Sequence, residues 1–69
     1  MSISARNCLK GKITDVKLGT IMAHVVIKVG QNVIESVITR QSAEEMKLKK
    51  GDTVTAVVKA TEVMVSKDS

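Results

Sequence analysis

The sequence predicts a small all-β domain with one short helix. Several short segments alternate apolar and polar residues with the period of two that is typical of half-buried strands. A helix-start signal stands between the third and the fourth of these segments. The chain has 69 residues and no proline, and we find no low-complexity segment, linker or convincing internal repeat in it. One domain spanning residues 1–69 is therefore expected.

The first three strands are expected over Leu9–Val16, Thr20–Val29 and Val33–Thr39. In the first, Leu9, Gly11 and Ile13 share one face, and the second alternates in the same way. Lys17–Gly19 and Gly30–Asn32 supply the turns between the strands. Both faces of the third strand are partly apolar, so we expect it to be central in the sheet and covered on both sides.

A short helix and two more strands complete the prediction. Ser42 and Glu45 have the spacing of a capping box, which predicts Ser42 as the N-cap of a helix that runs to Leu48. The last strands are expected over Val54–Ala60 and Val63–Val65, followed by a frayed polar tail at residues 66–69. Five strands with a helix between the third and the fourth predict a five-stranded OB-type barrel. Composition alone does not distinguish this barrel from an SH3-like one.

The composition indicates that the domain assembles with other copies. A chain of this length buries only about 60% of its unfolded surface, so its own core is marginal. Cys8 is the only cysteine, which excludes an intrachain disulfide, and no Cys/His cluster indicates a structural metal. Hydrophobic residues make up 43% of the chain, and much of this aliphatic surface is expected to lie between subunits.

The charge favours an anionic partner, because the formal net charge is +4. Nucleic acid, an anionic membrane surface and a small anion all satisfy this condition. No apolar run approaches the roughly 20 residues of a membrane span, and no basic segment followed by a hydrophobic stretch begins the chain. We therefore expect a cytoplasmic protein.

Catalysis has little support in the sequence. His24 lies in an alternating strand with no acid or nucleophile at a motif spacing, so a structural or interface role is expected. The four methionines, Met1, Met22, Met46 and Met64, are better explained as packing residues than as soft-metal ligands. Cys8 is expected to be a half-buried, inert thiol. Neither an enzyme nor a catalytic cofactor is predicted.

The residues with the clearest chemistry indicate a clamp for an anion. Arg6 and Lys59 carry hydrogen-bond donors without acceptors, and the hydroxyls of Ser4 and Thr61 can add more. Such a set suits a small tetrahedral oxyanion, whose oxygens only accept.

A combination of short motifs carries a family resemblance. The motifs are Ser4-Ala5-Arg6-Asn7, Val37-Ile38-Thr39 followed by Ser42, Leu48-Lys49-Lys50-Gly51, Val58-Lys59-Ala60-Thr61 and Val63-Met64. Together they span roughly residues 2–65, and the chain resembles the molybdenum-pterin-binding, or Mop, family of single-domain molbindins. The resemblance implies an OB-like fold, a molybdate or tungstate oxyanion as ligand and no catalytic cofactor.

The resemblance also implies which residues bind. Ser4, Arg6 and Lys59 match the residues that contact the oxyanion, and Ala60 contributes only its backbone N–H. Ser42 matches a further serine of the family pattern, although helix capping explains it equally well and both roles can coexist. The resemblance further implies a hexamer, arranged as a trimer of dimers, with oxyanions bound between subunits. A second class of site, lined by main-chain amides, is predicted near Gly19, Thr20, Ile21 and Met22.

A site made only of donors has a predictable selectivity. Protonated phosphate would place a hydroxyl donor against a donor, whereas molybdate, tungstate and sulfate are dianions near neutral pH. Size must then separate sulfate from the larger oxyanions, while molybdate and tungstate are hardly distinguished.

Two other functions remain open at this level. A basic OB domain could bind nucleic acid, but the chain has no Phe, Trp or Tyr on which bases could stack. An assembly module without a ligand explains the composition but leaves the Arg6 and Lys59 motifs as coincidences. We therefore predict a small oxyanion as partner, together with further copies of this chain, and neither nucleic acid nor membrane.

Overall fold

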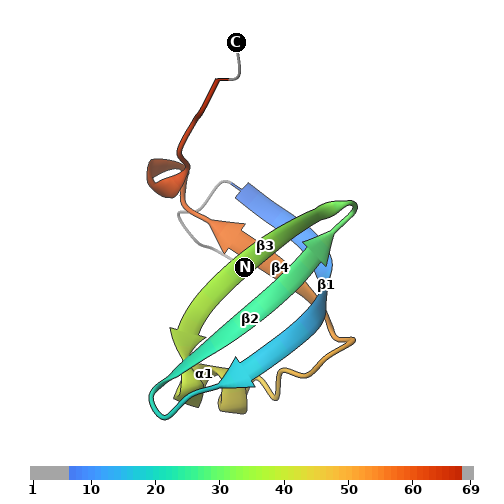
Figure 1. Ribbon diagram of the computed structural model, residues 1–69, viewed down its shortest axis with the longest axis vertical. Helices are drawn as coiled ribbons and strands as arrows, with labels where there is room; N and C mark the ends of the chain where they lie inside the picture. Colours follow the sequence, from blue (N-terminus) through green and yellow to red (C-terminus); the bar gives the residue numbers. More distant parts are fainter. Residues whose placement is uncertain (1–6, 68–69) are drawn as a thin grey trace.

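The computed structural model describes residues 7–67 as one antiparallel sheet with a short helix. Its elements are β1 (Asn7–Leu18), β2 (Met22–Val29), β3 (Asn32–Thr39), α1 (Arg40–Glu45), β4 (Thr53–Val58) and the 3-10 turn η1 (Ala60–Glu62). The strand order is β3-β2-β1-β4 (Figure 1). The first three strands form a meander, and β4 returns to the free side of β1. The predicted class, mostly β with one short helix, is confirmed.

The alternation in β2 is confirmed and builds the core. Ala23, Val25 and Ile27 are buried, whereas Met22 and Lys28 are exposed. The residues on the buried face pack with one another because strand side chains alternate between the two faces of a sheet. The central cluster consists of Ile13, Val25, Ile27 and Ala56.

β1 contains a bulge at Thr14 and pairs with two neighbouring strands. Ile13 lies opposite Ile27 and Asp15 lies opposite Val26, so Thr14 has no partner of its own in the β1–β2 ladder. The extra residue bends a strand and increases its twist. Residues 12–18 pair with β2 and residues 7–12 pair with β4, which makes β1 longer than the predicted 9–16.

Gly11 lies next to the end of the β1–β2 ladder, where β1 passes close to the end of β2. A Cβ at this position would be 2.5 Å from the Lys28 backbone oxygen and 2.8 Å from Cγ2 of Val29. Such distances are too short for any side chain, so only glycine allows this close approach.

The connections differ from the predictions in detail. The hairpin turn between β2 and β3 has two residues, Gly30 and Gln31, and Gly30 adopts a φ of 61° as its first residue. The helix begins at Arg40, and its N-cap is Thr39, whose side chain accepts a hydrogen bond from the Ser42 N–H at 3.1 Å. The prediction of Ser42 as N-cap is therefore wrong, because a threonine three residues earlier already fills that role.

The helix also ends earlier than predicted. Lys47, with a φ of 53°, follows the C-cap Met46. The N–H groups of Leu48 and Lys47 donate to the carbonyls of Ala43 and Glu44, each at 3.1 Å. This pair of bonds forms a Schellman motif, which terminates the helix and places Leu48 beyond it.

Four predictions about strands and burial are wrong. β3 is an edge strand, and Val33 and Val37 on its outer face are 60% and 63% exposed. Cys8 is exposed. β4 ends at Val58, before the predicted Ala60, because the chain turns into η1, and Val63–Val65 forms no strand.

Within a single copy, the outer-face valines of β3 and the apolar residues Val63–Val65 face solvent. Among residues 7–67, no helix has the length and apolar character that crossing a membrane requires.

Candidate oxyanion site

Pairing of β1 with β4 places Asn7 beside the strand end that precedes Lys59. Asn7, the last residue of the Ser4–Asn7 motif, lies opposite Val58. Its side-chain Nδ2 donates to the Val58 carbonyl at 3.2 Å, across 51 positions of sequence. The side chain of Asn7 is thus bonded to the residue that precedes Lys59. Sequence reasoning included Asn7 in the motif but did not assign it this anchoring role.

Lys59 occupies the junction between β4 and η1. Its backbone is extended (φ −66°, ψ 140°), and its carbonyl accepts the Glu62 N–H at 2.9 Å. Its side chain is exposed, and within the described part of the chain it forms no ion pair. The ammonium group is therefore available to an anion. Ala60 and Thr61 follow in η1 and are also exposed.

Ser4 and Arg6 lie outside the described residues. The described part of the predicted clamp therefore consists of Lys59 and Ala60, with Asn7 as the anchor beside them.

Ser42 lies at the other end of the molecule. It belongs to α1, whereas Lys59 lies next to η1, and Figure 1 shows these elements at opposite ends of the long axis. The Ser42 hydroxyl accepts a hydrogen bond from the Thr39 hydroxyl at 2.8 Å, so its own proton remains free to donate. One copy of the chain does not bring Ser42 and Lys59 into one site.

The predicted second site adjoins Ser42. In the turn between β1 and β2, the Gly19 N–H donates to the Met22 carbonyl at 2.8 Å. Arg40, the first residue of α1, donates from its backbone N–H to the Ile21 carbonyl at 2.7 Å and from Nη1 to the Gly19 carbonyl at 3.1 Å.

These bonds occupy the carbonyls of Gly19, Ile21 and Met22 and also the Gly19 N–H. They hold the Arg40 guanidinium beside the turn, where its Nε lies 3.5 Å from Glu44 Oε2. Thr20 lies between Gly19 and Ile21 in the turn and is exposed. Sequence reasoning missed Arg40, and only its position directly after the third strand could have indicated the contact.

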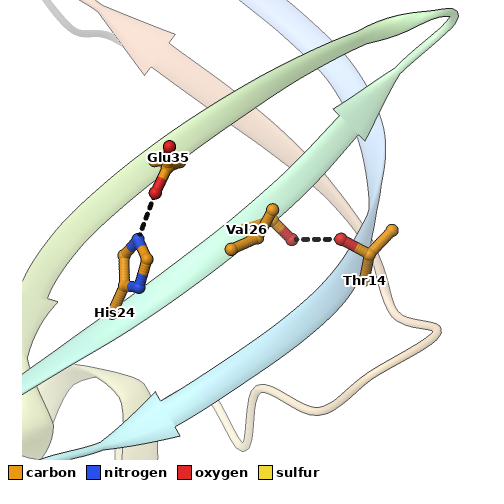
Figure 2. Close-up of polar contacts among 4 residues, drawn as sticks. All are labelled: Thr14, His24, Val26 and Glu35. Atoms are coloured by element: carbon orange, nitrogen blue, oxygen red, sulfur yellow. Dashed lines mark hydrogen bonds and ion pairs between the residues drawn. The ribbon is translucent and has the colours of Figure 1, made fainter.

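The outer face of the sheet carries a hydrogen-bonded His–Glu pair with no catalytic geometry. His24 Nε2 lies 2.8 Å from Glu35 Oε1 across β2 and β3, and the nearby Thr14 hydroxyl donates to the Val26 carbonyl at 3.4 Å (Figure 2). Both side chains of the pair are well exposed, so it contributes little to stability. Among the described residues, no group of His, Cys, Asp or Glu side chains is placed to hold a metal ion.

The order of the strands, the helix after β3 and the joined strand ends define a small OB-like β-domain with an exposed cation where β4 ends. The TOBE domain family matches the chain over residues 3–65, and the chain belongs to this family. Its resemblance to the Mop proteins is also confirmed. It is 52% identical over 66 residues to molybdenum-pterin-binding protein 1 of Clostridium pasteurianum, covering 94% of this chain and 97% of that protein.

Solved structures give the same result. A molybdate-binding protein from Sporomusa ovata superposes with a TM-score of 0.93 at 40% identity, over 97% of this chain and 100% of that one. The cytoplasmic molybdate-binding protein ModG, in a form with molybdate bound, gives a TM-score of 0.83 at 43% identity over 87% of this chain and 43% of that chain. The predicted OB-like fold is therefore confirmed.

Proposed function

We propose that this protein binds molybdate or tungstate as an intact oxyanion and serves molybdenum storage or homeostasis in the cytoplasm, without being an enzyme. The single observation that carries the proposal is the Asn7–Val58 contact at 3.2 Å. It joins Asn7, the last residue of the Ser4–Asn7 motif, to the strand end that precedes Lys59. The names of the relatives, which are molybdenum-pterin-binding and molybdate-binding proteins, support the same ligand.

The proposed binding groups are all donors. Lys59 supplies an ammonium group, Ala60 a backbone N–H, and Ser4 and Arg6 a hydroxyl and a guanidinium. Charge-assisted bonds from cations to oxyanions are short and strong, and a set without acceptors matches a fully deprotonated dianion. Proton transfer is not required of any of these groups, which fits binding rather than catalysis.

The proposed sites lie between subunits of a homo-oligomer, and a hexamer built as a trimer of dimers is expected. Ser42 and the Gly19–Met22 turn are at the opposite end of the copy from Lys59 (Figure 1). Two classes of site at two ends, each completed by a neighbouring copy, would use both sets of donors. The observation that supports a partner copy is the amount of apolar surface that one copy leaves exposed.

Calorimetric titration tests the ligand. We expect molybdate and tungstate to bind at low micromolar concentration or tighter, about −8 kcal/mol or better, and sulfate and phosphate far more weakly. Binding of sulfate with similar affinity would contradict the size argument. A single-stranded oligonucleotide titrated at moderate salt provides the control for the nucleic-acid alternative, and tight binding there would overturn the proposal.

A further inference from the structure

The two central strands of the sheet carry lysines on their outer face. Lys12 of β1 lies directly opposite Lys28 of β2, and Lys10 precedes Lys12 by two residues on the same face of β1. All three residues are exposed. Opposite residues of neighbouring strands have their Cα atoms about 5 Å apart, so the ladder holds two like charges side by side.

Acidic residues of the same chain do not neutralise these lysines. Among residues 7–67, none of the three forms an ion pair. Two acids of the same face, Asp15 and Glu35, both lie opposite Val26, and Glu35 is bonded to His24 at 2.8 Å (Figure 2). In a free copy the lysines are therefore solvated charges.

Protection of the sheet edges does not explain this placement. Lysines that prevent edge-to-edge aggregation lie on edge strands, whereas β1 and β2 are the central strands of the order β3-β2-β1-β4. Like charges directly opposite each other destabilise a sheet. The close approach at Gly11 adds to this cost, because a Cβ there would be 2.5 Å from the Lys28 backbone oxygen and the strands have no room to separate the charges. An acidic partner would remove the repulsion.

Exposed apolar residues flank the lysines on both sides. Val33 of β3 lies opposite Lys28 and is 60% exposed, and Val57 of β4 is 41% exposed. Val57 lies opposite Cys8, on the same face as Lys10. The phosphates of a nucleic acid give valine no contact, and the chain has no aromatic residue on which bases could stack. A protein segment with both carboxylates and aliphatic side chains matches both kinds of group.

We propose that this lysine face, defined by Lys10, Lys12, Lys28, Val33 and Val57, docks an acidic segment of another protein. Carboxylates of the partner lie against the opposed lysines, and its aliphatic side chains cover the valines. Such charge complementarity contributes to the specificity and the rate of association more than to affinity. The inference goes beyond the proposed oxyanion function, because it concerns a protein partner and requires no molybdate.

Fluorescence anisotropy tests the docking with a short labelled peptide of glutamate and leucine residues. The matched peptide has glutamine in place of glutamate. We expect only the glutamate peptide to bind, and its binding should weaken as salt is raised. Combining Lys12→Gln with Lys28→Gln should weaken binding about 10-fold, because two exposed ion pairs are lost. The control combines Lys17→Gln with Lys49→Gln, which removes the same charge outside the lysine face and should change binding by less than about 2-fold.

Three results would overturn the proposal. The first is equal binding of the two peptides, or equal binding by the parent and the variant that lacks both opposed lysines. The second is tighter binding of a single-stranded oligonucleotide of the same net charge, or of phosphatidylglycerol vesicles, through the same lysines. The third is a changed subunit number of that variant in light scattering, which would place the face between copies of this chain.

The cost of the opposed pair gives a second measurement that needs no partner. Lys28→Gln removes the repulsion, so it should raise the midpoint of urea unfolding at equal protein concentration. Lys49→Gln is the control and should leave the midpoint unchanged. An unchanged or lower midpoint in Lys28→Gln would contradict the proposal, because the opposed lysines would then have no cost for a partner to remove. Neither experiment contains molybdate, so a failure of the oxyanion function leaves both results unchanged.

Discussion

Lys59 differs from the other lysines of the chain in its backbone position. It follows the last residue of β4, where the ladder with β1 ends at the Asn7–Val58 pair. Lys28, in contrast, lies on the outer face of β2 opposite Lys12, where it serves as a solvated charge. Two lysines of equal formal charge are therefore predicted to contribute very differently to anion binding.

Replacing the clamp cations tests this difference. Lys59→Ala and Arg6→Ala should each weaken molybdate binding by about 2–4 kcal/mol, because the dianion loses a charge-assisted partner. Ser4→Ala should cost about 1 kcal/mol, since only a neutral donor is removed. Isothermal titration calorimetry gives the affinities. Lys28→Ala is the matched control and should change the affinity by less than about 0.5 kcal/mol.

Size exclusion must show that each of these variants still assembles. If Lys59→Ala assembles like the parent and binds molybdate with parental affinity, the clamp is wrong, whatever the fold.

Thr39 and Ser42 can now be tested separately. Thr39→Ala removes the N-cap acceptor and should lower the free energy of unfolding by about 1 kcal/mol with little effect on affinity. Ser42→Ala removes a hydroxyl that is not the cap, so stability without ligand should change by less than about 0.5 kcal/mol.

If Ser42 is a ligand, its variant should lose about 1 kcal/mol of molybdate affinity. Unchanged affinity in Ser42→Ala would remove this residue from the site.

At the scale of elements, β1 and β2 could be predicted because their neighbours lie within the same chain. Ala23, Val25 and Ile27 alternate with more exposed residues, and each is buried by β1, β3 and the core. The bulge at Thr14 had no signal in the sequence, because an extra residue in one strand is defined only by the partner opposite. The helix start was misplaced by three residues since Thr39 and Ser42 are both good caps.

β3 and Val63–Val65 show the limit of pattern reasoning. β3 was predicted to be covered on both sides and Val63–Val65 to form a strand, yet Val37 and Val65 are exposed in one copy. An apolar pattern predicts that a surface is buried. It does not indicate whether the same chain or another copy buries it. The same limit applies to the candidate site. The motifs predict which residues donate, but only the fold shows that the donors near Lys59 and those near Ser42 lie at two ends of the molecule.

The close approach of β1 to β2 at Gly11 gives a prediction for the stability of the sheet. A Cβ there would be 2.5 Å from backbone, which cannot shift as a flexible side chain can. Gly11→Ala should therefore lower the free energy of unfolding by about 1–3 kcal/mol.

Urea unfolding followed by far-ultraviolet circular dichroism measures this loss, since the chain has no aromatic residue for fluorescence. Gly30→Asn is the control, because a side chain at Gly30 meets nothing within 4 Å and asparagine tolerates a positive φ. Equal stability of Gly11→Ala and the parent would show that the two strands separate at this point.

At the scale of the whole molecule, one copy has too small a core for the apolar residues it carries. Among residues 7–67, the buried hydrophobic side chains are Ile13, Ala23, Val25, Ile27, Ala43 and Ala56, and three of these six are alanines. Large apolar residues on the outer sheet face and in the tail remain exposed. Assembly would cover most of them, and it would also gather the net charge of +4 per copy around each shared site, which attracts anions.

Sites shared between copies couple binding to assembly, which gives the last prediction. If the oxyanion contacts two copies, it binds the assembled protein more tightly than the dissociated one. Linkage is reciprocal, so molybdate should lower the concentration at which the assembly dissociates by the same factor by which assembly raises affinity. At a molybdate concentration of 100 times the dissociation constant, one site contributes about 2.7 kcal/mol to the bound state.

Native mass spectrometry over a dilution series, with sulfate as the control anion, reports the subunit number and the anion count together. We expect a hexamer that persists to lower concentration with molybdate than with sulfate. Monomers that retain molybdate with unchanged affinity after dilution would show instead that one copy encloses the anion by itself, and the intersubunit site would have to be abandoned.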